Sequence, residues 1–315
     1  MKNLITGIHG FVGSHLADCL LAQNEEVTGL ARSMTDNGNV MHIEDKIQVW
    51  VADVNDRVAL KKILAEVRPE RVYHLAAMSF PPDAEKEGSE AFATNFTGTL
   101  NLLQAVKELQ LNCRVLFAGS SEAYGIVTEQ ENPVKETQIL QPVSLYGVSK
   151  ASAEMLAQSY FLRDGLDVVR VRPFNHIGPR QNSRFVCSAF SRQIAMIEKG
   201  ADAVMQTGNL ESYRDFMDVR DTVRAYTAIM EKAGAGEVFN VCSGQAVSVQ
   251  SILDGLLEIS GIPIRIERDN KLYREEEPVR VAGDLSLLTE KTGWRPEIPL
   301  KQTLHDLLSH WRENS

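Results

Sequence analysis

The stretch that decides the fold is residues 3–13, which read NLITGIHGFVG. Its first four residues, Asn3 to Thr6, are strand-like, and glycines then recur at every third position, at residues 7, 10 and 13. This order predicts a strand over 2–6, a tight turn over 7–13 and a helix to about residue 23. Glycines permit the turn, the approach of backbone N–H groups to a phosphate and close helix–strand packing, so a dinucleotide site is expected. Its expected contacts are Gly7, Gly10, Phe11, Val12 and Gly13.

Strand-like and helical segments alternate through the rest of the first half. Strands are predicted over 26–31, 48–52, 71–75, 114–118 and 167–172, with intervening helices ending near 67, 109 and 164. This alternation predicts an α/β fold with a doubly wound parallel Rossmann sheet covered by helices on both faces. Ligands of such sheets bind at the carboxyl ends of the strands.

The pattern changes after residue 172. Residues 172–181, RPFNHIGPRQ, are rich in chain-breaking residues, and three helices then alternate with short strands. The predicted helices span about 185–198, 219–232 and 249–259, and the strands 203–205, 238–241 and 265–267. We therefore predict a dinucleotide-binding Rossmann domain over 1–172 and a smaller, mixed substrate-binding portion over 173–315. Segments around 208–245 are candidates to return to the first sheet.

Composition and net charge limit the kinds of molecule that the chain is expected to bind. The net charge of −9 argues against a nucleic-acid or anionic-membrane binder, which needs a basic face. The four cysteines are scattered without Cys-x-x-Cys or metal-ligand spacing, so reduced thiols and no metal are expected. No apolar run approaches the roughly 20 residues of a membrane span, and because the strand-like residues start directly after Met1 we expect no signal segment. We expect a cytoplasmic protein.

The residues after the second strand bear on the choice of dinucleotide. NAD-binding folds place a carboxylate here for the ribose hydroxyls, whereas this chain has Arg32 and Ser33. An arginine and a serine suit a 2′-phosphate, so NADP(H) is favoured and NAD(H) remains possible. An exposed arginine without a ligand is the alternative. Asp53 and Val54, at the end of the next strand, are expected at the adenine.

The chemistry of the chain is expected at Tyr146 and Lys150. They are four residues apart, so on a helix they share one face. A neighbouring ammonium favours the phenolate and would lower the tyrosine pKa from about 10. Ser120, after the strand over 114–118, could hold a carbonyl oxygen against the tyrosine. Alone, the spacing is common in amphipathic helices, where the pair is an interfacial tyrosine beside a solvated lysine.

Six motifs together carry a resemblance. They are TGIHGFVG at 6–13, HLAA at 74–77, TNFTGT at 94–99, GSSEAYG at 119–125, YGVSK at 146–150 and RPFNHIGP at 172–179. The chain resembles the extended short-chain dehydrogenase/reductase family that acts on nucleotide sugars. Its subfamily pattern looks most like the GDP-6-deoxy-4-keto-D-mannose reductases, which make GDP-D-rhamnose. GDP-mannose 4,6-dehydratases and nucleotide-sugar 4-epimerases are the alternatives.

Two features favour the reductases and one departs from them. Dehydratases usually carry threonine where this chain has Ser120, and they tend to exceed 315 residues. The reductases usually have Arg-Pro-x-Glu near the C-terminus, whereas residues 274–277 read REEE here.

The resemblance implies roles for individual residues. Ser120 and Tyr146 would polarise and protonate a carbonyl, with Lys150 stabilising the tyrosinate and holding the nicotinamide ribose. Glu122 would be the proton-abstracting base of a dehydratase or a loop carboxylate. Further cofactor contacts are implied at Leu75, Ala76, Ala77 and Asn95, and substrate contacts at Ser79, Ser121, Asn175, Arg180, Arg214, Arg274 and Glu277. The implied substrate is a nucleotide-diphosphate sugar, with a GDP-sugar favoured, and the implied assembly is a homodimer through the helices holding Asn95 and Tyr146.

Overall fold

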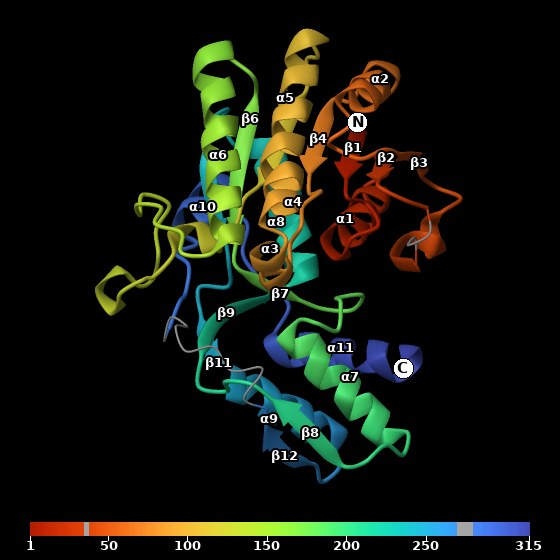
Figure 1. Cartoon of the computed structure of the whole chain (residues 1–315), viewed down its shortest axis with the longest axis vertical. Helices are drawn as coiled ribbons and strands as arrows, with labels where there is room; N and C mark the ends of the chain where they lie inside the picture. The colour runs from red at the N-terminus through yellow and green to blue at the C-terminus, as the bar shows by residue number, and fades with distance from the viewer. Residues whose placement is uncertain (35–37, 270–279) are drawn as a thin grey trace.

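Seven parallel strands form the central sheet, in the order β10-β6-β5-β4-β1-β2-β3 (Figure 1). The computed structural model describes residues 1–34, 38–269 and 280–315. The strands are β1 Lys2–Thr6, β2 Glu26–Ala31, β3 Gln48–Val51, β4 Arg71–His74, β5 Arg114–Ala118, β6 Val168–Pro173 and β10 Val238–Val241. The predicted doubly wound α/β fold is confirmed. The carboxyl ends of β1, β4 and β5 lead into residues 7, 75 and 119, which gathers these segments at one edge.

Helices cover both faces of this sheet. Side chains alternate between the two faces along a strand, so each face of the sheet carries apolar residues that the helices bury. In β1, Leu4 packs into one apolar layer and Ile5 into the other. The Leu4 layer holds α2 Arg57–Val67, α5 Gly98–Glu108 and α6 Leu145–Asp164. The Ile5 layer holds α1 Phe11–Ala22, α8 Val219–Lys232 and α10 Ser286–Thr292. Within the described ranges, no helix has both the length and the apolar character needed to cross a bilayer.

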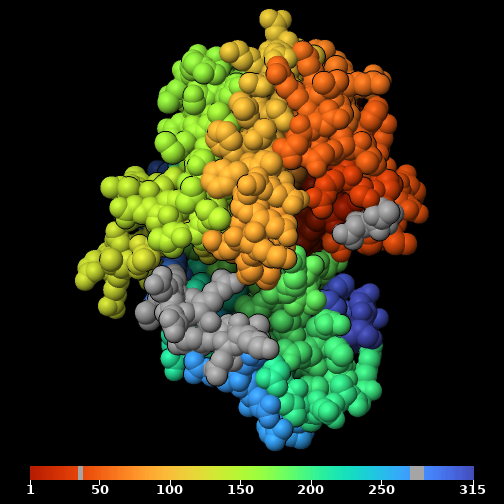
Figure 2. All heavy atoms as spheres, viewed as in Figure 1, coloured from red at the N-terminus to blue at the C-terminus, as the bar shows by residue number. Residues whose placement is uncertain are grey.

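The second half of the chain builds a smaller mixed unit below the sheet in Figure 1. Its strands form one sheet of three, β11-β9-β7, and one of two, β12-β8. They are β7 Asn175–Ile177, β8 Val204–Thr207, β9 Tyr213–Asp218, β11 Ala246–Ser248 and β12 Arg265–Arg268. The helices α7 Val186–Glu198, α9 Val249–Ser260 and α11 Leu300–Asn314 share a core around Ile194, Leu253 and Leu307. On the face seen in Figure 2, the surface is recessed between the red-orange and green parts.

Two segments within residues 208–245 take different paths. β10 pairs with β6 as an edge strand of the large sheet, with Val238 opposite Arg170. β9 instead pairs with β7 and β11 in the smaller unit. The chain therefore crosses between the two units more than once.

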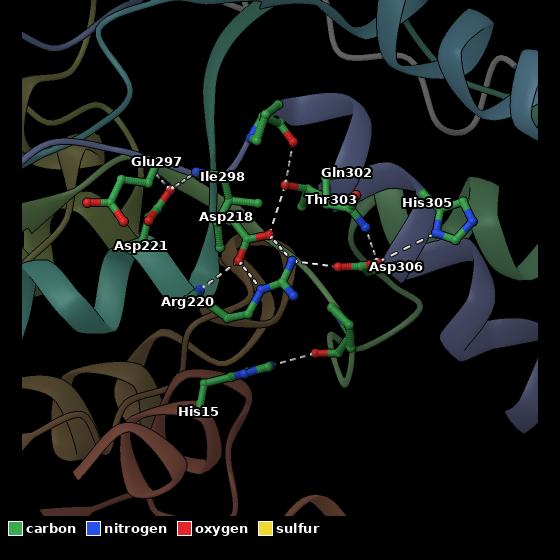
Figure 3. Close-up of polar contacts among 12 residues, drawn as sticks. His15, Asp218, Arg220, Asp221, Glu297, Ile298, Gln302, Thr303, His305 and Asp306 are labelled. Carbon is green, nitrogen blue, oxygen red and sulfur yellow. Dashed lines mark hydrogen bonds and ion pairs between the residues drawn. The ribbon is translucent and has the colours of Figure 1, made fainter. Parts of the chain in front are cut away.

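The C-terminal helix is fastened at the point where β9 becomes α8 (Figure 3). Buried Asp218 accepts a hydrogen bond from the Thr303 hydroxyl at 2.8 Å and two from the Arg220 guanidinium at 2.9 and 2.7 Å. Arg220 also donates to Asp306 at 2.7 Å. Asp221 accepts two backbone N–H groups just before α11, each at 2.9 Å. The motif DVRD at 218–221 thus joins α11 to the rest of the fold.

The helix predicted to end near residue 109 is interrupted, which corrects the expectation of one regular helix. α4 Gly88–Phe92 and α5 are separated by a π-helical turn over Ala93–Thr97. The turn contains Asn95, whose Oδ1 accepts from Met78 N at 2.8 Å and whose Nδ2 donates to Ser149 Oγ at 2.9 Å. Such turns are often found at functional sites.

Candidate active site

The glycine turn leaves bare backbone facing an open cavity. Gly7 has φ +75°, and a Cβ there would lie 3.0 Å from backbone atoms of Ala76. A Cβ on Gly13 would lie 2.3 Å from the carbonyl oxygen of Gly7. Both positions therefore require glycine. The turn brings β1, the start of α1 and the segment after β4 into direct contact, as a phosphate-binding cradle requires.

Two cavities meet at this cradle. The larger, of about 880 Å³, extends past β2 and β3, and the smaller, of about 350 Å³, extends towards α6 and β7. Gly7, Gly10, Phe11, Ala76, Ala77 and Ser79 line both. Arg32, Asp53, Val54 and Arg180 line the larger cavity only. Val12, Gly13, Leu75, Ser120, Ser121, Glu122, Tyr146 and Asn175 line the smaller cavity only. The structure thus brings most of the sequence-predicted residues to one continuous cleft.

Three predicted residues among those that the structure describes do not line either cavity. Lys150 and Asn95 are buried, and Arg214 lies in β9 with its Nη1 donating to Tyr213 O. Arg274 and Glu277 fall outside the described residues.

Arg180, which is predicted at the substrate, lies on the wall of the larger cavity, whereas Ser120 and Tyr146 lie on the wall of the smaller one. Its Nη2 donates to Asp18 at 2.7 Å and contacts His15 Nδ1 at 2.7 Å, while Nη1 donates to Asn39 O at 3.1 Å. The guanidinium is therefore held by groups of the chain at this wall, and its contact with the substrate stays a prediction.

Tyr146 is a protonated acid in this site. Burial raises the pKa of its phenol to about 12, and a hydrogen bond with the Ser120 hydroxyl acts in the opposite direction. The expectation of a lowered tyrosine pKa is therefore wrong, because burial disfavours the phenolate more than the Ser120 hydrogen bond favours it. Ser120 is placed by its own turn, since its Oγ accepts from Glu122 N at 3.2 Å. Glu122 is exposed on the same wall.

Lys150 lies one turn further along α6. Burial lowers the pKa of its ammonium to about 8, whereas the carboxylate of Glu154 raises it. The ammonium lies 5.3 Å from the ring centroid of Phe117, within the range of a cation–π contact. Lys150 therefore changes charge close to working pH, which suits a group that supports proton transfer.

A buried chain of hydroxyls and one imidazole runs beside Lys150. The Thr6 hydroxyl accepts the N–H groups of Leu75 and Ala76, so its proton goes to His74 Nδ1 at 2.9 Å. His74 Nε2 then donates to Thr99 Oγ1 at 3.0 Å. Burial, together with the charge of Lys150, lowers the pKa of His74 to about 3, so the ring is neutral. This chain fixes the ends of β1 and β4 beneath the cleft.

Asn95 acts on the tyrosine helix. Its amide binds the Ser149 hydroxyl, which donates to the carbonyl of Tyr146 at 2.8 Å. Asn95 also binds both backbone groups of Met78. The residue therefore ties the start of α6 to the cavity wall at Met78.

Several residues of the cleft were not predicted from the sequence. His9 lies within the glycine turn, and both of its ring nitrogens are buried without a partner in the described chain. Its position between Gly7 and Gly10 was the available signal. The wall of the larger cavity also includes Phe80, Gln181, Phe185, His310 and Trp311. His310 and Trp311 are brought there by the folding of α11, which no local pattern indicates.

The fold, the glycine cradle and the Ser120–Tyr146–Lys150 arrangement define an NAD(P)-dependent enzyme of the extended short-chain dehydrogenase/reductase class. Residues 4–307 match the GDP-mannose 4,6-dehydratase family. The chain belongs to that family.

Individual relatives cover the whole chain. It is 35% identical to GDP-6-deoxy-D-mannose reductase of Pseudomonas aeruginosa, over 98% of this chain and 96% of the relative. It is 30% identical to human GDP-mannose 4,6 dehydratase, over 97% and 90%. Among solved structures, RMD from Pseudomonas aeruginosa complexed with NADPH matches with a TM-score of 0.89 at 33% identity, over 100% of both chains. A UDP-glucose 4-epimerase of Thermotoga maritima, solved with UDP-glucose, matches with 0.90 at 28% identity, over 100% and 99%.

Proposed function

We propose that this chain is an NADPH-dependent reductase that converts GDP-6-deoxy-4-keto-D-mannose to GDP-D-rhamnose. The observation that carries the proposal is the position of Ser120 and Tyr146 on the smaller cavity, which shares the glycine cradle with the larger one. A keto group in the smaller cavity would face a proton donor on one side and a nicotinamide on the other. The likeness to GDP-6-deoxy-D-mannose reductase over nearly the whole chain supports this substrate.

The cleft fits a phosphorylated dinucleotide. The cradle at Gly7 and Gly13 has no room for a Cβ, and His9 presents two buried, unpartnered ring nitrogens beside it. Arg32 is exposed at the end of β2 on the larger cavity, 3.8 Å from Glu90. The cradle would hold the diphosphate and Arg32 the 2′-phosphate, so NADP(H) is preferred and NAD(H) can bind. The NADPH-bound relative supports this preference.

The residues of the site would donate the proton and stabilise the charge that its transfer leaves behind. When bound, reduced nicotinamide supplies the hydride for the C4 carbonyl carbon. Tyr146 donates its phenolic proton to the carbonyl oxygen, so that the C=O becomes a CH–OH group. The Ser120 hydroxyl holds the same oxygen, and the Lys150 ammonium stabilises the tyrosinate that remains. General-acid catalysis of this kind contributes about 10²–10⁴-fold to a rate.

Glu122 supports a second candidate, a nucleotide-sugar 4,6-dehydratase. Its carboxylate lines the smaller cavity and its charge acts on Tyr146. A carboxylate there could remove a proton next to a transient keto group, after which water would leave and the cofactor would end unchanged. The 30% identity to GDP-mannose 4,6 dehydratase is consistent with this alternative.

One assay separates the two reactions. Purified protein is given NADPH with enzymatically prepared GDP-6-deoxy-4-keto-D-mannose and, in parallel, GDP-mannose without reductant. We expect one NADPH oxidised per keto sugar consumed and no reaction of GDP-mannose. Water loss from GDP-mannose without NADPH oxidation in the first mixture would reject the reductase.

We also propose that the enzyme is a homodimer through α5 and α6. Met155 and Leu162 on α6 are 66% and 71% exposed, and at a spacing of seven residues they share one face of the helix, which would lie in this interface. Light scattering should give twice the chain mass, and Leu162→Glu should reduce it to a monomer. A monomeric wild type would reject the dimer.

A further inference from the structure

A buried ion pair lies directly behind the catalytic turn. Arg172 of β6 and Glu154 of α6 are 5% and 2% exposed. Arg172 Nε donates to both carboxylate oxygens at 3.1 and 2.9 Å, and Nη2 donates to Oε1 at 2.6 Å. A second arginine, Arg170, approaches the same carboxylate at 3.5 Å. Burying an ion pair costs desolvation free energy that a surface pair does not lose. A contribution to stability therefore does not by itself explain why Arg172 and Glu154 are buried together.

The same guanidinium reaches the turn that carries Ser120 and Glu122. Arg172 Nη1 donates to the Tyr124 hydroxyl at 2.9 Å, and Tyr124 is the last residue of the η3 turn Ser121–Tyr124. The Tyr124 hydroxyl donates in turn to Asn240 Oδ1 at 2.7 Å. The far end of the turn touches the ion pair as well. A Cβ on Gly119 would lie 3.2 Å from Glu154 Oε2, so the carboxylate packs against the residue before Ser120.

The network also holds the long loop that follows the turn. Arg172 Nη1 donates to Glu136 O at 2.9 Å. Asn240 Nδ2 donates to Val134 O, and its backbone N–H donates to Glu136 Oε1, both at 2.8 Å. One guanidinium therefore connects α6, β6, the η3 turn, this loop and, through Tyr124, β10.

We propose that Arg172 is a positioning residue for the reaction: with Glu154 and Tyr124 it fixes the Ser120–Glu122 turn against the helix that carries Tyr146. The two ends of the turn are held by the two ends of one buried ion pair, so the Ser120 hydroxyl keeps its place beside the Tyr146 phenol. The proposal rests on the proposed function only in requiring that Ser120 acts on the reacting oxygen. Arg172 itself touches neither cavity.

The test is a double-mutant cycle between Tyr124 and Ser120. Tyr124→Phe keeps the ring and removes the hydroxyl that joins the turn to Arg172. Since small misplacements of reacting groups cost up to about 10²-fold in rate, we expect kcat to fall about 10- to 100-fold with KM little changed. In a Ser120→Ala background, Tyr124→Phe should cost no more than about twofold, because the hydroxyl that it positions is already gone. Arg172→Lys, which keeps the charge but cannot bind Glu154 and Tyr124 together, should behave as Tyr124→Phe does.

Tyr73→Phe is the matched control. Tyr73 is equally buried, and its hydroxyl lies near Arg71 on β4 and not at the catalytic turn, so its removal should leave kcat unchanged. An equal loss from Tyr124→Phe in both backgrounds would show that the network only stabilises the fold and would overturn the proposal. So would an unchanged kcat in Tyr124→Phe.

Failure of the proposed function is seen separately, before any variant is compared, because the wild type would then oxidise no NADPH. In that case the same cycle is measured on water loss from GDP-mannose, where Ser120 would serve the same oxygen. Additive losses there would overturn the proposal equally.

Discussion

Glu154 lies one helical turn beyond Lys150 on α6, and its carboxylate is the group that opposes the lowering of the lysine pKa by burial. Arg172 and Arg170 share that carboxylate, so its charge is directed partly away from Lys150. The protonation of the lysine thus depends on an ion pair one turn along the same face of the helix. This relationship has consequences for the pH dependence of the enzyme.

The pH dependence of the reaction rate should follow the protonation state of the Lys150 side chain. With a pKa of about 8, the lysine is protonated below that pH and loses its charge above it, so kcat/KM for carbonyl reduction should fall as pH rises through about 8. Glu154→Gln removes the negative charge that raises this pKa, so the fall should begin at lower pH. Glu258→Gln, an exposed substitution on α9, is the control and should leave the profile in place. An unshifted profile in Glu154→Gln would contradict this coupling.

Tyr146→Phe should abolish turnover without emptying the cofactor site. In the proposed reaction the phenol would supply the proton, whereas the cradle at Gly7 and Gly13 would bind the dinucleotide through its backbone. Loss of the general acid should lower kcat by at least about 10²–10⁴-fold. NADPH affinity, measured by fluorescence titration, should stay close to that of the wild type. Substantial residual turnover would remove Tyr146 from its role as the acid.

Arg32→Ala should change the choice of cofactor. A charge-assisted hydrogen bond contributes about 1.5–3 kcal/mol, so NADPH binding should weaken about 10- to 100-fold. NADH lacks the 2′-phosphate and should be nearly unaffected. The exposed ion pair with Glu90 is too long, at 3.8 Å, for its loss to explain such a change. Equal weakening of both cofactors by isothermal titration would refute the 2′-phosphate assignment.

His74 should make the fold sensitive to acid. Its pKa of about 3 in the folded chain lies below the unfolded value of about 6.5, so the unfolded state takes up the proton first as pH falls. Stability should therefore be lost below about pH 6.5, with a contribution of about 1.4 kcal/mol per pH unit from this residue. His74→Gln should reduce the slope of unfolding free energy between pH 6 and 4.5 by that amount, as urea titrations can measure. An unchanged slope would show that His74 is already charged in the native state.

The parts of the fold that could be predicted were those with local signals. The glycine turn and the apolar strands placed the first sheet to within a residue or two, as β6 at Val168–Pro173 shows against the predicted 167–172. β7 and β11 are three residues long, too short for a period-two pattern to register. The place of α11 depends on Asp218 and Thr303, which are 85 residues apart.

The residues of the site likewise fall into those that local motifs predict and those whose position depends on distant contacts. Ser120, Tyr146 and the cradle follow from motifs that are continuous in the sequence. The position of the Arg180 side chain could not be predicted, because its partner Asp18 is 162 residues away in the sequence. The φ of +72° at Arg180 is likewise a conformation that the sequence pattern does not indicate. The direction of the Tyr146 pKa shift could not be predicted for a related reason, because burial is a property of the whole fold and spacing along a helix does not reveal it.

The most direct test of the central claim follows the hydride. NADPH deuterated at the transferred C4 position is incubated with enzyme and GDP-6-deoxy-4-keto-D-mannose, and the product is analysed by NMR and mass spectrometry. The reductase account predicts one deuterium at sugar C4 and one equivalent of NADP⁺. A sugar product without deuterium at C4, formed with no net oxidation of NADPH, would contradict it.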